Sequence, residues 1–182
     1  MFEDKNHKSI IELVSVIITT YHNEKFLPRA IGCLLNQTYK NIEIIVVDDN
    51  PPESEARIQT ENIMKNYPQV IYLKHNRNLN GAAARNTGIS VAKGKYIAFL
   101  DNDDIFFSTH IADCVEALQV HRECSAVFSA VIKICEGYCW DVIPPIRDNE
   151  VKTILFSERS LGTGSNLFLK SEEFLFAFHI HW

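Results

Sequence analysis

The sequence lacks the patterns that mark several large classes of protein. It contains no run of about 20 apolar residues, so we expect no membrane-spanning helix. It has no basic run, and its 23 acidic side chains outnumber 18 lysines and arginines, which argues against nucleic acid as a partner. Residues 1–8 are polar and lack the apolar core of a signal peptide, so we expect a cytoplasmic protein.

Further absences narrow the kind of site to expect. The five cysteines form no C-x-x-C pair, and no Cys/His set has the spacing of a zinc site, so we expect them to be small core or surface residues. Neither G-x-G-x-x-G nor G-x-x-x-x-G-K-[ST] occurs. The dinucleotide-binding fingerprint and the P-loop are therefore excluded.

What the sequence does contain is a regular alternation of two patterns. Short β-branched apolar runs predict buried strands, and apolar residues at helical spacing predict helices. The predicted strands cover residues 14–19, 42–47, 70–73, 96–100, 126–134 and 166–170, and the predicted helices cover residues 23–35, 53–67, 81–92 and 108–120. In the second helix we expect Ile58, Ile63 and Met64 to face the core. After residue 137 the pattern weakens until the last strand.

This alternation predicts an α/β fold in a single domain, residues 1–182. We expect a Rossmann-like, mostly parallel sheet with helices on both faces, in three layers. Ligands of such sheets bind beyond the carboxyl ends of the strands. Three of those ends carry polar clusters, which are Thr19-Thr20-Tyr21, Asp48-Asp49-Asn50 and Asp101-Asn102-Asp103-Asp104. Five carboxylates should therefore share one edge of the sheet.

The cluster of residues 101–104 is the sharpest of these signals. Three carboxylates within four residues repel one another, and a divalent cation removes that cost. Mg²⁺ and Mn²⁺ prefer carboxylate oxygens and share their shell with phosphate oxygens. The sequence therefore predicts a metal site with Asp101 and Asp103 as ligands, in place of a solvated acidic turn.

The other clusters leave their roles open. Asp48 and Asp49 are suited to a second metal, to accepting hydrogen bonds from a base N–H or a ribose hydroxyl, or to a turn. Tyr21 is suited to stacking on a base or to half-burial at a strand end. Arg85 lies on the predicted helix 81–92 and can offer its guanidinium to a phosphate or a base carbonyl, or form a surface ion pair.

Taken together, four motifs resemble those of glycosyltransferase family 2, which has the GT-A fold. They are, in chain order, Val-Ser-Val-Ile-Ile-Thr-Thr-Tyr-His-Asn-Glu, Ile-Ile-Val-Val-Asp-Asp, Asn-Gly-Ala-Ala-Ala-Arg-Asn-Thr-Gly-Ile and Gly-Lys-Tyr-Ile-Ala-Phe-Leu-Asp-Asn-Asp-Asp. Their order and spacing make the resemblance specific over about residues 13–135, the donor-binding part. Residues 136–182 resemble the acceptor-side part weakly.

The resemblance implies an inverting transferase that takes a nucleotide-activated sugar, commonly a UDP-sugar, with Mg²⁺ or Mn²⁺. It places the Asp103 carboxylate on a metal that bridges the diphosphate, and Asp101 on the ribose, the sugar or the metal. The nucleotide-sugar contacts that it implies are those of Thr20, Tyr21, Asp48, Asp49, Arg85, Asp101 and Asn102. Thr20 and Tyr21 would flank the base, and Asp48 and Asp49 would contact uracil or ribose.

The general base is expected to be missing from the chain. In the family it is an acidic residue well downstream of the D-x-D motif, near the start of a helix, often in a Glu-Asp pair. Here Glu172 and Glu173 occupy an earlier helix start, and no Glu-Asp pair follows. We therefore expect a domain that is incomplete at its C-terminus, with Glu172 and Glu173 as the weaker candidates for the base.

Two functions follow from these patterns. The first is sugar transfer from a UDP-sugar to a hydroxyl of a sugar or lipid-linked glycan, in cell-surface polysaccharide or glycoconjugate synthesis. The alternative is a sugar-nucleotide-binding fragment or module without transfer. The apolar residues between 174 and 182 suit unfinished core, a dimer contact or peripheral contact with the inner face of a membrane.

Overall fold

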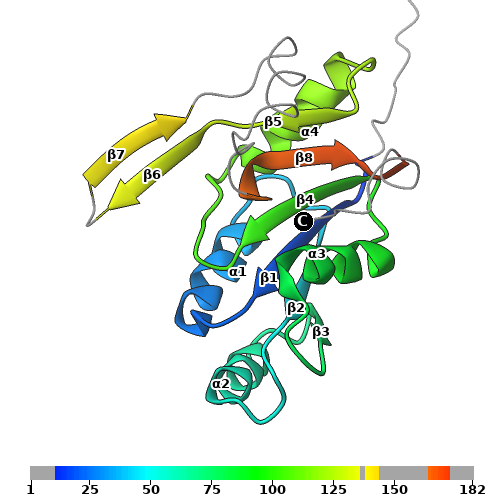
Figure 1. Cartoon of the computed structure of the whole chain (residues 1–182). Helices are drawn as coiled ribbons and strands as arrows, with labels where there is room; N and C mark the ends of the chain where they lie inside the picture. Colours follow the sequence, from blue (N-terminus) through cyan, green and yellow to red (C-terminus); the bar gives the residue numbers. More distant parts are fainter. Residues whose placement is uncertain (1–10, 136–137, 144–163, 173–182) are drawn as a thin grey trace, which may run out of the picture.

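The chain forms a six-stranded, mostly parallel sheet (Figure 1). The computed structural model describes residues 11–135, 138–143 and 164–172. In spatial order the strands are β3 (Ile71–Lys74), β2 (Ile42–Asp48), β1 (Val14–Thr20), β4 (Tyr96–Asp101), β8 (Leu167–Lys170) and β5 (Ala126–Phe128). The strands β1 to β4 are parallel, whereas β8 runs antiparallel to both β4 and β5.

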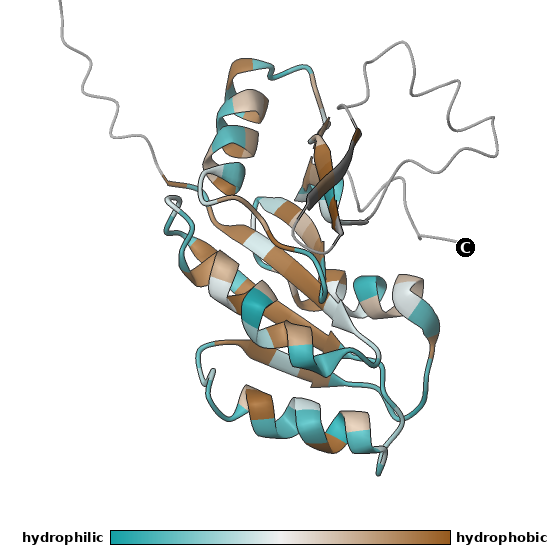
Figure 2. Cartoon of the chain, turned by 90° about the vertical axis from the view of Figure 1, so that its left-hand side faces the viewer, coloured by the Kyte–Doolittle hydropathy of each residue, from teal (hydrophilic) through white to brown (hydrophobic). Residues whose placement is uncertain are grey.

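Helices cover both faces of this sheet, as the sequence predicts. They are η1 (Glu24–Phe26), α1 (Leu27–Leu35), α2 (Glu55–Met64), α3 (Asn80–Val91), α4 (His110–Val120) and the short η2 (Gly164–Asn166). Side chains of α1, α2 and α4 share one buried cluster with the sheet, and α3 contributes to a second cluster on the opposite face. Figure 2 shows the apolar strands enclosed between more polar helices.

The central strands alternate strictly between the two clusters. On β1, Val16 and Ile18 pack toward α1 and α4, whereas Ile17 packs toward α3. On β2, Val46 belongs to the cluster on the α1 and α4 face, and Val47 belongs to the cluster on the α3 face. Because successive side chains of a strand point to opposite faces, a strand buried on both faces must be apolar at nearly every position. Even-numbered residues of β1, β2 and β4 thus face α1, α2 and α4, and odd-numbered residues face α3.

The predicted strand 126–134 is two strands in the structure. Its first part is β5, and its second part belongs to β6 (Val131–Cys135), which pairs antiparallel with β7 (Tyr138–Ile143) in a separate two-stranded ribbon (Figure 1). The sequence analysis did not assign β7. Hydrophobic pattern alone does not show that the two halves of one apolar run have different partners, because strand pairing depends on contacts distant in sequence.

The second predicted helix is shorter than expected, and one of its three predicted inward residues is exposed. Its cap is Ser54, whose side chain accepts a hydrogen bond from the backbone of Arg57 at 3.2 Å. Ile58 is 52% exposed, so the prediction that it faces the core is wrong. The predictions for Met64, which is buried, and Ile63, which packs partly buried against the core, are confirmed. The other buried residues of α2 are Ala56, Arg57 and Thr60. A buried arginine takes the inward position because its guanidinium finds hydrogen-bond acceptors there, as described below.

Close contact between α3 and β1 depends on Gly88. A Cβ atom at this position would lie 2.4 Å from Cγ2 of Ile17, which is completely buried. Ala84, one turn earlier, is also completely buried. Small residues on this face of α3 therefore let the helix lie directly on the sheet.

Replacing Gly88 by alanine is expected to lower the free energy of unfolding by about 1–3 kcal/mol, because the added methyl group overpacks a filled core. Urea denaturation followed by circular dichroism measures this change. Gly32→Ala on α1 is the matched control, since a Cβ there meets nothing within 4 Å. Helix propensity alone predicts that Gly32→Ala stabilises the protein by about 0.5–1 kcal/mol. Equal stability of the two variants would contradict the close packing inferred at Gly88.

Several expectations concern residues outside the described part of the chain. Glu173 and the apolar residues between 174 and 182 are among them, as is most of the predicted acceptor-side part. Among the residues described, every helix is too short or too polar to cross a membrane.

Candidate functional site

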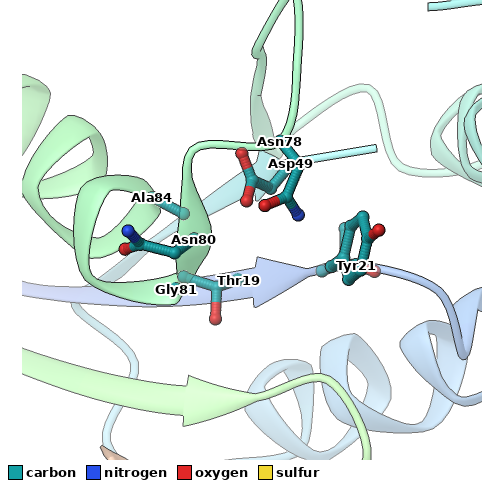
Figure 3. Close-up of a pocket in the computed structure, with 8 residues that line it drawn as sticks. Thr19, Tyr21, Asp49, Asn78, Asn80, Gly81 and Ala84 are labelled. Carbon is teal, nitrogen blue, oxygen red and sulfur yellow. The ribbon is translucent and has the colours of Figure 1, made fainter. Parts of the chain in front are cut away.

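A cavity lies at the carboxyl edge of the sheet, where the strand order reverses. The chain passes from β1 to β2 and β3 on one side and then returns through α3 to β4 on the other side of β1. Such a reversal opens a crevice in which ligands of α/β proteins bind. The cavity has a volume of about 290 Å³ (Figure 3). Its lining residues are Thr19, Thr20, Tyr21, Asp49, Asn78, Asn80, Gly81 and Ala84.

The first turn of α3 forms one wall of the cavity. The side-chain Oδ1 of Asn80 accepts hydrogen bonds from the backbone N–H groups of Ala82 and Ala83, at 3.0 and 3.1 Å. Asn80 adopts a left-handed backbone with φ of 76°, which asparagine tolerates better than most residues. Gly81 and Ala84 carry little or no side chain, so this wall leaves space for a ligand.

A tight loop after β1 presents Tyr21 to the cavity. Tyr21 is 47% exposed, and the next two residues, His22 and Asn23, both have positive φ. Two buried asparagines hold this loop from neighbouring strand ends. Asn50 Oδ1 accepts from the His22 backbone N–H at 2.9 Å, and Asn102 Nδ2 donates to the His22 carbonyl at 3.0 Å. The Tyr21 ring is thus exposed on a fixed backbone.

The structure places Thr20 and Asn102 inside the fold. Thr20 is 1% exposed, and its hydroxyl accepts a hydrogen bond from Asn102 Nδ2 at 3.0 Å. Asn102 is also buried. These two residues join the ends of β1 and β4, so they support the edge of the cavity through the backbone.

Asp48 also points into the fold. Its Oδ1 accepts from the backbone and side chain of Asn50 at 2.9 and 2.8 Å. Its Oδ2 accepts from the Tyr72 hydroxyl at 2.5 Å and lies 3.0 Å from Arg57 Nε. Burial, together with the hydrogen bond to Asp48, raises the pKa of Tyr72 well above its usual value. Both oxygens of Asp48 are therefore occupied by neighbours within the protein.

Arg57 connects the two loops that flank the cavity. Its Nη2 donates to the backbone carbonyls of Asp48, Asn50 and His75, at 3.1 Å for Asp48 and 2.8 Å for His75. Its Nε lies close to Asp48 but off the direction of a hydrogen bond, so that contact is electrostatic. One buried guanidinium thus fixes the chain after β2 and after β3.

Asp49 lines the cavity and has one oxygen without a hydrogen-bond partner among the described residues. Its Oδ1 accepts from His75 Nδ1 at 2.7 Å and from the Leu79 backbone N–H at 2.9 Å. Its Oδ2 is buried, and no group in the described ranges forms a hydrogen bond with it. A buried carboxylate oxygen needs a donor. The cavity therefore contains an acceptor that a ligand N–H or O–H group can satisfy.

The three carboxylates after β4 form what we call the rim of this site, because Asp101 is the register partner of Thr19, which lines the cavity. Asp101 Oδ1 lies 2.7 Å from Arg85 Nη2, so the guanidinium offsets part of the negative charge. Burial raises the pKa of Asp104, the hydrogen bond from Ser165 opposes the rise, and the charges of Asp101 and Asp103 add to it. Asp103 is exposed, and its backbone carbonyl accepts from Arg29 Nη2 at 2.8 Å.

A bound cation would have to take part of its shell from a ligand. In the described ranges, no three or more His, Cys, Asp or Glu side chains are grouped to hold a metal ion. The oxygens of Asp101 and Asp103 nevertheless suit Mg²⁺ or Mn²⁺, which keep waters and bind substrate phosphates beside one or two carboxylates. The residues present therefore fit a cation that arrives with a diphosphate.

Glu172 lies near the amino ends of the parallel strands, opposite the carboxyl ends that form the cavity. Lys170, two residues before it, pairs with Tyr96 at the amino end of β4, whereas Asp101 is at the carboxyl end of the same strand. Ser171 is hydrogen-bonded to the Lys95 carbonyl at 2.8 Å. At about 3.3 Å per residue, the length of β4 separates Glu172 from the cavity by about 17 Å. The structure does not bring Glu172 to the other predicted site residues.

Three residues that contribute to this site, Asn78, His75 and Ser165, were not predicted from the sequence. Asn78 lines the cavity close to Asp49 (Figure 3), and His75 binds Asp49 from behind. Their signal was available, because β3 also ends at this edge and polar residues follow it. Ser165 accepts from the Asp101 backbone N–H at 2.9 Å. Ser165 belongs to η2, 64 residues away in sequence, which no local signal connects to β4.

Comparison with known sequences identifies related proteins. The family model for "Glycosyl transferase family 2" matches residues 15–172. MJ1057 of Methanocaldococcus jannaschii, an uncharacterized glycosyltransferase, is 39% identical over 130 residues, which are 69% of this chain and 43% of that protein. WfaP of Escherichia coli, a UDP-Glc:alpha-D-GlcNAc-diphosphoundecaprenol beta-1,3-glucosyltransferase, is 38% identical over 112 residues, which are 62% of this chain and 43% of that protein.

A solved structure shares the fold. The mannosyltransferase PcManGT from Pyrobaculum calidifontis, in complex with GDP-Man and Mn²⁺, superposes with a TM-score of 0.65 at 18% identity. The match covers 92% of this chain and 47% of that chain. The chain described here thus spans less than half of the length of each of these three proteins.

Proposed function

The chain belongs to glycosyltransferase family 2, and we propose that it binds a UDP-sugar and a divalent cation for inverting transfer to an acceptor hydroxyl. The observation that carries this proposal is the unsatisfied Oδ2 of Asp49 in the cavity beside Tyr21. The similarity to WfaP, which uses UDP-Glc, supports the choice of nucleotide and a role in making cell-surface polysaccharide or glycoconjugate. The acceptor is then a sugar or a lipid-linked glycan.

Base recognition follows from the chemistry of the cavity. Uracil has one imide N–H between two carbonyl groups, and a carboxylate is an acceptor without a donor of its own. Asp49 Oδ2 thus matches the imide N–H. The Tyr21 ring offers an apolar face on which the base can stack, and the Asn78 amide can donate to a uracil carbonyl.

The diphosphate is proposed to lie over the rim. Asp103, with Asp101 beside it, would hold Mg²⁺ or Mn²⁺, which supplies the positive charge that stabilises a diphosphate leaving group. Arg85 already balances Asp101 at 2.7 Å and can turn its remaining N–H groups toward a phosphate or a base carbonyl. The first turn of α3, with its small residues, lets the ligand approach this arginine.

A second function, sugar-nucleotide binding without transfer, is favoured by the position of Glu172. Attack by an acceptor hydroxyl on the anomeric carbon needs a general base at the reacting atoms. Glu172 lies at the far edge of the sheet, so it is not placed to take that proton. The described residues therefore support donor binding directly, and transfer requires a base from elsewhere.

Calorimetric titration with UDP tests the proposal. We expect Mn²⁺ to raise the affinity for UDP by about tenfold or more relative to the same titration in EDTA, because the cation joins diphosphate and carboxylates. ADP is the control ligand, since it carries the same diphosphate on a base that does not match Asp49. Binding of UDP no tighter than that of ADP would overturn the nucleotide assignment. A transfer assay with UDP-Glc then separates the enzyme from the binding module.

A further inference from the structure

The cavity acceptor is held from behind by a buried hydrogen-bond chain. Asp49 Oδ1 contacts His75 Nδ1 at 2.7 Å, and His75 Nε2 contacts the hydroxyl of Thr87 on α3 at 2.8 Å. Asp49 and His75 are both more than nine-tenths buried. The chain therefore runs from the cavity through the loop after β3 to the middle of α3.

The network assigns one proton position. A carboxylate only accepts, so His75 Nδ1 carries the hydrogen that Asp49 receives. Nε2 forms its hydrogen bond with the Thr87 hydroxyl, which can donate to the ring or accept from it. The backbone of His75 is also fixed, because its N–H donates to the Asp48 carbonyl at 2.9 Å and its carbonyl accepts from Arg57 at 2.8 Å. Neither the ring nor the main chain of His75 is left to move.

Two donors on one oxygen restrict the carboxylate. His75 and the Leu79 N–H both bind Oδ1 of Asp49, so rotation of the carboxylate would break two hydrogen bonds at once. Oδ2, the unpaired oxygen of this cavity-lining carboxylate, is consequently held in one position. Holding an acceptor at one point, with a buried supporting shell, is how a binding site discriminates between similar ligands.

We propose that His75 is a positioning residue that fixes Asp49 Oδ2 and so makes the cavity select uracil over cytosine, an inference that rests on the proposed function. Uracil presents an N–H at ring position 3, where cytosine presents a lone pair and carries its donors on the adjacent amino group. A fixed Oδ2 accepts from the uracil N–H and repels the cytosine lone pair. An Asp49 released from His75 can turn toward the cytosine amino group, and the discrimination falls.

The test compares UDP and CDP affinities, by calorimetry in Mn²⁺, for the wild-type chain and His75→Leu. We expect the wild-type chain to bind UDP more tightly than CDP. His75→Leu should reduce the ratio of the two affinities by roughly tenfold, because it removes one hydrogen bond to a charged group. Thr87→Val, which removes the outer link without touching Asp49, should shift the ratio in the same direction by less. His75→Asn keeps a donor near the position of Nδ1 and should restore much of the wild-type ratio.

The controls separate positioning from folding. A merely structural role of His75 would weaken UDP and CDP alike and leave their ratio unchanged. His121→Leu, at an exposed histidine beyond α4, should leave both affinities unchanged. If His75→Leu is too unstable to titrate, Thr87→Val alone decides the matter.

Each outcome has one meaning. A wild-type chain that prefers UDP, with His75→Leu and Thr87→Val retaining the same ratio, would overturn this inference and leave the proposed function standing. A wild-type chain that binds no UDP would overturn the proposed function and this inference with it. A wild-type chain that binds UDP and CDP equally would overturn the inference alone.

Discussion

Replacing Arg57 by methionine is expected to lower the free energy of unfolding by about 3–5 kcal/mol, the cost of leaving one partner of a buried ion pair alone. Asp48 would remain completely buried and lose the only cationic group within hydrogen-bonding range that the structure shows for it among described residues. The carbonyls of Asp48, Asn50 and His75 would lose their shared donor as well. Urea denaturation monitored by circular dichroism measures the loss.

The ion pair between Lys74 and Glu61 provides the control for this prediction. Its N–O distance is 3.0 Å, as in the pair of Arg57 and Asp48, but both of its side chains are more than two-fifths exposed. Lys74→Met should therefore cost less than about 1 kcal/mol. The double variant Arg57→Met/Asp48→Asn should be more stable than Arg57→Met, because it also removes the buried negative charge of Asp48 that Arg57→Met leaves without a partner. Similar losses for Arg57→Met and Lys74→Met would contradict the role assigned to burial.

Replacing Asp103 by asparagine is expected to lower the affinity for UDP in Mn²⁺ by about tenfold or more, which is at least about 1.4 kcal/mol. Of the three rim carboxylates, Asp101 is paired with Arg85 and Asp104 is partly buried, whereas Asp103 is exposed. Its carboxylate is thus the one best placed to meet a cation that arrives with the diphosphate. Calorimetry in Mn²⁺ and in EDTA measures the effect, which should nearly vanish in EDTA.

Glu116→Gln is the matched control for the Asp103 variant. Glu116 is exposed on α4, and its replacement changes the net charge by the same amount. We expect wild-type UDP affinity and wild-type dependence on Mn²⁺ for Glu116→Gln. An Asp103→Asn protein that binds UDP as tightly as the wild-type chain in Mn²⁺ would refute Asp103 as a metal ligand.

The central sheet could be predicted from the sequence because its strands are buried on both faces. Such strands are continuous apolar runs, and the runs 14–19, 42–47 and 96–100 coincide with β1, β2 and β4 to within one residue. The placement of β8 between β4 and β5 could not be predicted in this way. It depends on pairing between segments about 40 and 70 residues apart in sequence, for which no local pattern exists.

The roles of Asp48 and Asp49 show what the site prediction lacked. Both follow a buried strand, so the sequence analysis treated them alike. In the structure they point to opposite faces, since side chains alternate along a strand, and only the odd-numbered residue faces α3 and the cavity. Asp101, also odd-numbered, meets Arg85 of α3 for the same reason. The alternation itself could be predicted from the sequence. Which residues face α3 could not, because that depends on which helix covers which face of the sheet.

Asn102 illustrates a different limit. Its place within the D-x-D motif suggested contact with the sugar nucleotide, yet its amide joins β1 to the loop that carries Tyr21. That role depends on the distance between two strand ends. A motif specifies which residues stand together in the chain, whereas the geometry decides which of them turn toward the solvent and which toward the backbone.

The antiparallel position of β8 also bears on the order in which the chain folds. The strands β1 to β4 are joined by successive helices, and their pairing, including that of β1 with β4 about 80 residues further along the chain, needs no residue beyond Asp101. β5 reaches the sheet through β8, which follows it by about 40 residues, so β5 has to wait until that segment has been synthesised. During synthesis, the part of the sheet that lines the cavity is therefore in a position to assemble before β5 and β8 join it.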